Sequence, residues 1–176
     1  MALLPPPKGN GFLCHENFMN IYEEGMNLLE EKMGQNKDNV IALATIALEL
    51  SSKGLPCPRV RDVDAYYHQG SFYIVTHAKS NKVRQIMANP EVSISANLLD
   101  FTGIGQAVSL GWVKDPKNAE IRETLRKVFS EWYDFANNEE DENCVFVAIH
   151  LTHATLRIDH GVKFYHYDFL NQLVTN

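Results

Sequence analysis

The chain has 176 residues, a net charge of −6, 45% hydrophobic and 22% charged residues. A chain of this length and composition can bury a core without disulfides or a structural metal, which excludes a largely disordered protein. The acidic excess and the absence of a Lys/Arg block argue against nucleic-acid binding. No apolar run reaches the roughly 18 residues of a membrane span, so we expect one cytoplasmic domain over residues 1–176.

The N-terminal third predicts an arm, a helix and a buried strand. The Pro-rich start, residues 1–16, is expected to form an N-terminal arm. Apolar residues recur at helical spacing from Phe18 to Met33, which predicts an amphipathic helix over residues 17–33. The run VIALATIAL over residues 40–48 is rich in β-branched residues and predicts a buried strand.

The remaining elements are mostly strands that are separated by turn signals. Residues 59–76 predict two strands joined by a hairpin at Gly70, and Ser80 is positioned to begin a short helix that Asn89-Pro90 ends. Asp115-Pro116 predicts the start of a third helix. Further strands are expected at 92–98, 104–114, 144–151, 154–158 and 162–167. Short strands without regular alternation with helices predict a mainly β protein, an antiparallel barrel with about three flanking helices.

Two segments have the composition of an anion site. Strand periodicity places Arg59 and Arg61 on one face, where two guanidinium groups could meet the same anion. Residues 76–82, THAKSNK, combine a strand end, hydroxyl groups, a helix N-terminus and Lys82. The alternative is that the arginines are solvated or paired with Asp62 and Asp64.

In order and spacing, these segments resemble the pyridoxamine 5'-phosphate oxidase-like FMN-binding split barrels. The resemblance rests on PRVR, FYIVT, SNK followed by QI, and NPEVS. It implies a split β-barrel, a homodimer with FMN at the subunit interface, and roles for Arg59, Thr76 and Lys82 in holding the FMN phosphate and ribityl chain. It further implies that several neighbouring residues contact the FMN and that one residue approaches it from the partner subunit. The residues concerned are Val60, Arg61, Val75, Ser80 and Asn81 as neighbours, and Gln106 from the partner.

The C-terminus departs from the true oxidase, because it lacks the Arg-x-His element and the Trp and Arg that contact the flavin. The chain therefore resembles the general-stress-protein and putative flavin reductase branch. The resemblance implies an FMN flavoprotein that passes electrons from a nicotinamide-type donor to a small acceptor. Phe164 and Tyr165 are candidate ring neighbours.

Other interpretations stay open. The same barrel could bind or sense a flavin, F420 or haem without turnover, or it could have an empty site that takes an apolar ligand or a protein partner. His150 and His153 have HxxH spacing on a predicted strand, where residues three apart do not share a face as metal ligands would, so no metal is expected. Cys14, Cys57 and Cys144 form an odd set without CxxC spacing, which predicts reduced thiols.

Overall fold

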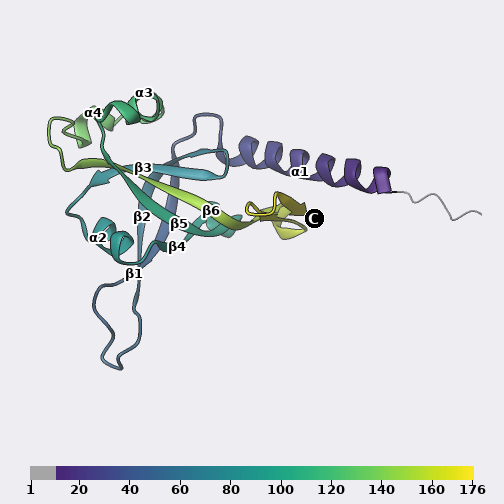
Figure 1. The fold of residues 1–176 in the computed structure, drawn as a ribbon, viewed down its shortest axis with the longest axis horizontal. Helices are drawn as coiled ribbons and strands as arrows, with labels where there is room; N and C mark the ends of the chain where they lie inside the picture. The colour runs from purple at the N-terminus through teal and green to yellow at the C-terminus, as the bar shows by residue number, and fades with distance from the viewer. Residues whose placement is uncertain (1–10) are drawn as a thin grey trace, which may run out of the picture.

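A computed structural model describes residues 11–176, with side chains from Ile21 onward except that of Leu99. Figure 1 shows a β-barrel with helices around it. The strands are β1 (Asn39–Ile46), β2 (Pro58–His68), β3 (Ser71–His77), β4 (Glu91–Ala96), β5 (Phe101–Trp112), β6 (Cys144–Ile158), β7 (Lys163–Asp168) and β8 (Leu173–Thr175). The helices are α1 (Gly11–Met33), α2 (Asn81–Ala88), α3 (Ala119–Val128) and α4 (Tyr133–Ala136). Single 3₁₀ turns lie at Asn97–Leu99, Pro116–Asn118 and Asp159–Gly161.

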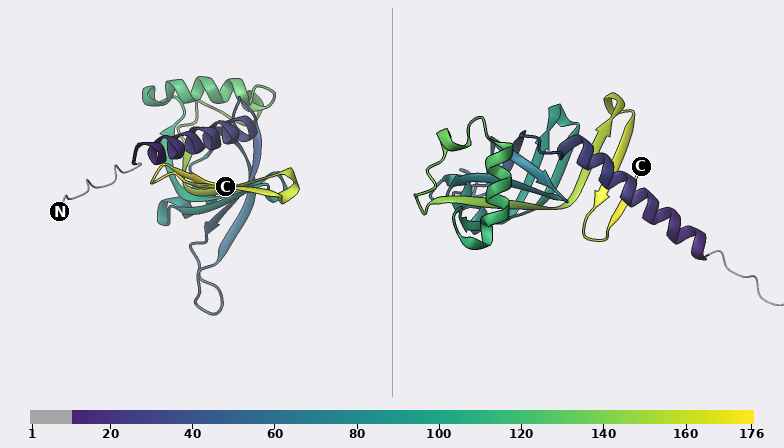
Figure 2. Two further views of the ribbon diagram at one scale, coloured as in Figure 1. Left: turned by 90° about the vertical axis from the view of Figure 1, so that its right-hand side faces the viewer. Right: turned by 90° about the horizontal axis from the view of Figure 1, so that it is seen from above.

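The barrel is antiparallel and closed by six strands. The strands follow the order β3-β2-β1-β4-β5-β6, and pairing of β3 with β6 closes the ring. Strands β7 and β8 extend the sheet beyond β6 as an outer hairpin, visible in yellow in Figure 2. The predicted mainly β, antiparallel barrel with flanking helices is confirmed.

Two apolar clusters hold the barrel and its helices together. Alternation along the strands sends every second residue inward, and these residues, with Leu29 and Met33 of α1, form the main cluster. The second cluster lies outside the barrel, where α3 and α4 cover β3, β5 and β6 (Figure 1). Its buried members are Tyr66, Val113, Leu125, Phe129, Tyr133, Cys144 and Phe146. Of the described cysteines, Cys57 and Cys144 are free thiols, and burial raises the pKa of Cys144 to about 11.

The barrel is split between β2 and β3. These strands pair only from Tyr66 to His68 and from Ser71 to Tyr73, next to their hairpin turn. Beyond it β2 continues along β1, whereas β3 continues along β6. The start of β2 and the end of β3 are therefore on opposite sides of an opening, and α2 follows β3 directly.

Several strand boundaries differ from the predictions. A single strand, β6, replaces the predicted pair 144–151 and 154–158, because Thr152 forms a bulge opposite β5 that bends the strand without ending it. β4 ends at Ala96, since Asn97 and Leu98 adopt positive φ, and β5 starts at Phe101 where a turn was expected. The three-residue strand β8 was not predicted, because NQLVTN contains too few apolar residues to signal a strand.

Helix α1 begins at Gly11, so the prediction that residues 11–16 belong to an arm is wrong; the rest of that arm, residues 1–10, lies outside the described residues. No proline follows Pro7 in this stretch, and nothing in the sequence prevents the helix from extending. The helix packs against β8 (Figure 2). A Cβ atom at Gly25 would lie 2.6 Å from Val174 Cγ1, so glycine permits this approach. No helix within residues 11–176 is long and apolar enough to cross a membrane.

A charged cluster fastens α3 and α4 to the loop that precedes β6. The Glu139 carboxylate accepts hydrogen bonds from Arg122, at 2.9 Å from Nε, and from the Tyr133 hydroxyl at 3.1 Å. Arg126 Nη1 lies 3.1 Å from the same carboxylate. These hydrogen bonds, led by that of Arg122, lower the pKa of Glu139 to about 2.

We expect Glu139→Gln to lower the free energy of unfolding at neutral pH by about 2 kcal/mol, because Arg122 loses its charged partner and Arg126 keeps only Asp134. A carboxyl with a lowered folded-state pKa stabilises the protein above its unfolded pKa. The difference between variant and wild type should therefore be full above pH 4.5 and shrink as the pH falls toward about 2. Urea unfolding at several pH values measures it. Glu140→Gln, which alters an exposed pair with Lys114, is the control, and an equal loss there would contradict the prediction.

Candidate anion-binding site

A cleft opens at the split end of the barrel, between the start of β2, the loop after β1, and α2. Its volume is about 260 Å³. Four of the predicted site residues, Arg59, Val60, Arg61 and Asn81, line it. The other lining residues are Leu48, Glu49, Arg84 and Gln85. The two segments that the sequence suggested as an anion site thus meet in one place.

Strand pairing aims Arg59 and Arg61 at the same side of β2. Arg59 pairs with Thr45 and Arg61 pairs with Leu43 on β1. Directly paired residues share a face of the sheet, and both partners on β1 are buried. The two arginines therefore share one face of β2, as predicted, and this face points inward, at the end of the barrel where the interior opens. No Asp62 or Asp64 ion pair with them occurs among the described side chains.

Arg61 is held by a buried polar network that sequence reasoning missed. Its Nη1 donates to Thr45 Oγ1 at 2.6 Å and to the Leu43 carbonyl at 3.3 Å, and its Nη2 donates to Gln85 Oε1 at 2.9 Å. Thr45 Oγ1 in turn donates to Gln85 Oε1 at 2.6 Å. Both Thr45 and Gln85 are buried. In the sequence, the only signal of this network was that Thr45 and Gln85 are polar at positions where the periodicity of a strand and of a helix predicts inward-facing apolar residues.

The first turn of α2 supplies further polar groups. Ser80 occupies the N-cap position, as predicted, but its side chain makes no capping hydrogen bond. Its Oγ is buried and has no hydrogen-bond partner within the described part of the chain. Asn81, Arg84 and Gln85 follow at the spacing that places residues on one helix face, and all three line the cleft.

Positive charge gathers here without a matching carboxylate. Among the described residues, no carboxylate lies within ion-pairing distance of Arg59, Arg61, Lys82 or Arg84. Burial, and then the nearby Arg59, lower the pKa of Arg61. Burial, and then the nearby Arg61, lower the pKa of Lys82. The positive charges of these side chains repel one another, so an anion bound among them would be stabilised electrostatically.

Val75, Thr76 and Lys82 do not line the cleft. Lys82 lies close enough to Arg61 for the two positive charges to interact. Thr76 pairs with Val145 on β6 and lies beyond the last β2–β3 pair, so it faces the split. Val75 packs outward against the cluster beneath α3 and α4. The link from β3 to α2 is fixed by the Ala78 N–H, which donates to the Asn143 carbonyl at 2.7 Å.

Gln106 is not brought to this cleft. It points away from the barrel on the outer face of β5, where its Nε2 donates to Glu91 Oε1 at 2.7 Å. Ile104 and Val108 flank it on the same face with exposed fractions of 51% and 45%. Gln106 therefore does not reach the anion site of its own chain.

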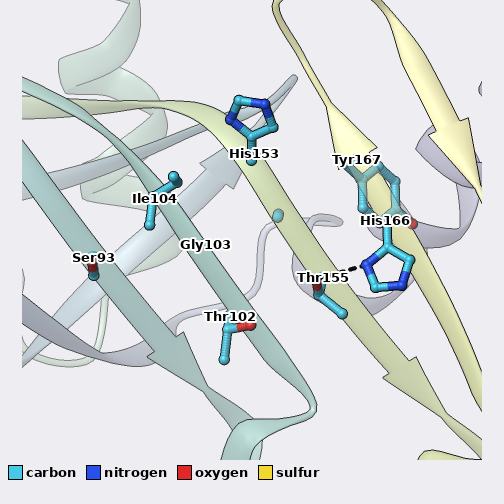
Figure 3. A pocket seen from close by; sticks show the side chains of 9 residues that line it. Ser93, Thr102, Gly103, Ile104, His153, Thr155, His166 and Tyr167 are labelled. Carbon is cyan, nitrogen blue, oxygen red and sulfur yellow. Dashed lines mark hydrogen bonds between the residues drawn. The ribbon is translucent and has the colours of Figure 1, made fainter.

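The outer face of β4 to β7 carries a separate, open hollow of about 450 Å³ (Figure 3). Ser93, Thr102, Ile104 and His153 line it, and Thr155 hydrogen-bonds His166 Nδ1 at 3.1 Å.

Of the candidate ring neighbours, Phe164 is on this outer face beside Arg157, whereas Tyr165 is buried in the main cluster. Neither is at the anion cleft. His150 bonds Ser71 and His153 lies 3.8 Å from Asp168, so they have different partners.

No protein-family model matches the chain, and no curated protein is similar to it in sequence. Solved structures do match. A putative pyridoxamine 5'-phosphate oxidase from Listeria innocua has 13% identity and a TM-score of 0.53 over 77% of this chain and 96% of its own. This chain has the pyridoxamine 5'-phosphate oxidase-like split-barrel fold. The resemblance predicted from the sequence is thereby confirmed for the fold.

Other split barrels of this kind differ in what they bind. A FAD-binding protein from Mesorhizobium loti has 17% identity and a TM-score of 0.52, over 72% of this chain and 90% of its own. A heme-binding protein from Mycobacterium smegmatis has 14% identity and a TM-score of 0.57, over 81% of this chain and 58% of its own. At such identities the split barrel is common to all of them, and the ligand has to be argued from the residues of each site.

We expect Gln85→Met to destabilise this split barrel by about 1–3 kcal/mol, because a side chain of similar volume leaves Arg61 and Thr45 without a buried acceptor. Gln106→Met is the matched control, since its exposed bond to Glu91 should contribute no more than about 0.5 kcal/mol. Urea unfolding of both variants measures the difference. Equal stability of the two variants would show that the Arg61 network does not support the barrel.

Proposed function

We propose that this chain is an FMN-binding flavoprotein that holds the FMN phosphate in the cleft between β2 and α2. The observation that carries the proposal is the gathering of Arg59, Arg61 and Arg84 in one cleft without an ion-paired carboxylate. Guanidinium groups are the side chains best suited to phosphate, because their planar donors match its oxygens.

The charge of the cleft fits a phosphate monoester. Its lining residues include three guanidinium groups and the single carboxylate of Glu49, which leaves two positive charges. A phosphate monoester carries about −1.5 to −2 charges at pH 7. Phosphate would therefore relieve the mutual repulsion of the cations.

The size of the cleft supports binding of the phosphate end alone. At about 260 Å³ it is smaller than the roughly 300–1,000 Å³ of pockets that enclose whole ligands. The ribityl chain would leave along the split, past Thr76 and toward Lys82, whereas Val75 packs outward under α3 and α4 and would not contact it. The ring would then lie outside the barrel, where a second chain could cover it.

A homodimer with FMN at the subunit interface accounts for Gln106. Its place on the outer face of β5 rules out contact with the cleft of its own chain, so a role at the flavin requires a second copy. The exposed Ile104 and Val108 on both sides of Gln106 provide apolar surface for that contact. The dimer is thus part of the proposed site.

For the reaction, we propose electron transfer from a nicotinamide-type donor to a small acceptor, in the cytoplasm. Bound FMN supplies the redox chemistry, while the chain contributes binding, orientation and electrostatics. Arg59 and Arg84 would bind the phosphate, and the network of Arg61, Thr45 and Gln85 would keep the cleft in shape. The other candidate is a binding or sensing module without turnover, which anaerobic mixing with NADH or NADPH separates from an enzyme.

The purified protein should retain a yellow flavin spectrum after FMN is added and the excess is removed by gel filtration. Arg59→Ala should weaken FMN binding by roughly 10- to 150-fold, since it removes charge-assisted hydrogen bonds of about 1.5–3 kcal/mol. Titration followed by flavin fluorescence measures the affinity. Lys79→Ala, which removes an exposed cation outside the cleft, is the control. A colourless wild-type protein would contradict FMN binding, and the same column run with haem or F420 would then test those ligands.

The dimer proposal predicts that flavin binding depends on protein concentration. Ile104→Lys should shift the protein toward monomer in sedimentation velocity, because it places charge in the apolar part of the contact. FMN affinity should fall with it, although the phosphate cleft is unaltered. Leu170→Lys, at an exposed position after β7, should change neither. A monomeric wild type that binds FMN tightly would overturn the proposal.

A further inference from the structure

Only some of the cations in the cleft are free to meet a ligand. Arg61 directs Nη1 and Nη2 at Thr45, Leu43 and Gln85, so much of its donor capacity is used within the barrel. Arg59 and Arg84, by contrast, make no side-chain hydrogen bond or ion pair to any described residue. Both line the cleft, one from β2 and the other from α2.

Arg84 is placed by the helix that carries the predicted site residues. The Arg84 N–H donates to the Ser80 carbonyl at 3.1 Å, which fixes its backbone in the first turn of α2. Val83 and Ile86 are buried beneath the helix and set its rotation. One turn along from Asn81, the Arg84 side chain consequently faces the cleft, and Gln85 beside it joins the network of Arg61.

We propose that Arg84 is a specificity-determining residue that forms, with Arg59, a two-guanidinium clamp for the terminal phosphate of the flavin nucleotide. This inference rests on the proposed function and adds to it a residue that neither the motifs nor the resemblance indicated. In this arrangement Arg61 is a positioning residue, because its hydrogen bonds to Thr45 and Gln85 hold β1, β2 and α2 together around the cleft. The clamp selects FMN over riboflavin, which has the same ring and ribityl chain but no phosphate.

Glu49 leaves the donors of Arg59 and Arg84 available to a ligand. It is the carboxylate that lines the same cleft, yet no ion pair to Arg59 or Arg84 is formed within the described part of the chain. Both arginine side chains are exposed, so their donors are accessible to a ligand. A bound phosphate would instead take the donors of both arginines and be repelled weakly by Glu49.

The test is a titration of wild type, Arg84→Ala, Arg84→Lys and Lys79→Ala with FMN and, separately, with riboflavin. Arg84→Ala should weaken FMN about tenfold to a hundredfold and leave riboflavin affinity unchanged. Arg84→Lys should recover part of the loss, because lysine keeps the charge without the planar fork. Lys79→Ala should match wild type for both ligands. Circular dichroism and thermal unfolding of each variant confirm that it is folded.

Each outcome has one meaning. FMN binding by wild type with an unchanged affinity in Arg84→Ala overturns the clamp and leaves the proposed function standing. An equal loss of FMN and riboflavin in Arg84→Ala also overturns it, since the residue would then not act on the phosphate. Failure of wild type to bind either flavin overturns the proposed function and the clamp together. A loss confined to FMN, with partial recovery in Arg84→Lys, establishes the clamp.

Discussion

The Arg61 network is the constraint on which the anion cleft depends. It joins α2, through Gln85, to the paired strands β1 and β2, through Thr45 and Arg61. A guanidinium that is partly buried, as that of Arg61 is, loses hydration and is stable only when its donors are used. Here the interior supplies the acceptors, and the same bonds that satisfy Arg61 fix the distance between the strand that carries Arg59 and the helix that carries Arg84.

The split of the barrel explains why this end needs side-chain hydrogen bonds, and it provides the opening through which a ligand could enter. Strands β2 and β3 separate after three residue pairs, and each continues with a different neighbour. A continuous ladder would have filled the space with backbone hydrogen bonds. The opening is instead bordered by side chains and by the start of α2. Cations can gather there because solvent reaches them, while the buried ends of Arg61 and Lys82 experience enough desolvation to lower their pKa values.

The sequence predicted the parts of this arrangement that depend on local periodicity. Alternation along β2 placed Arg59 and Arg61 on one face, and the N-cap signal at Ser80 located α2. Long-range contacts could not be predicted in the same way. Thr45 and Gln85 belong to segments 40 positions apart in the chain, and only the folded barrel reveals that both face Arg61. Arg84 was overlooked because a lone arginine on a short helix is ordinarily a solvated surface residue. The bulge at Thr152 was hidden for a related reason, since it depends on the register against β5.

In the proposed dimer, the inward and outer faces of the sheet have different roles, and each flavin would contact one face from each copy of the chain. The inward end of β2 and α2 concentrates fixed charge, which suits an anion that stays in place. The outer face of β5 presents Gln106 between exposed apolar residues and contributes no arginine or lysine to the hollow beside it. A planar, largely uncharged ring is favoured on such a surface, whereas a phosphate is not. One chain would therefore anchor the charged end of the nucleotide while its partner faces the reacting end, and neither surface alone has the chemistry for both.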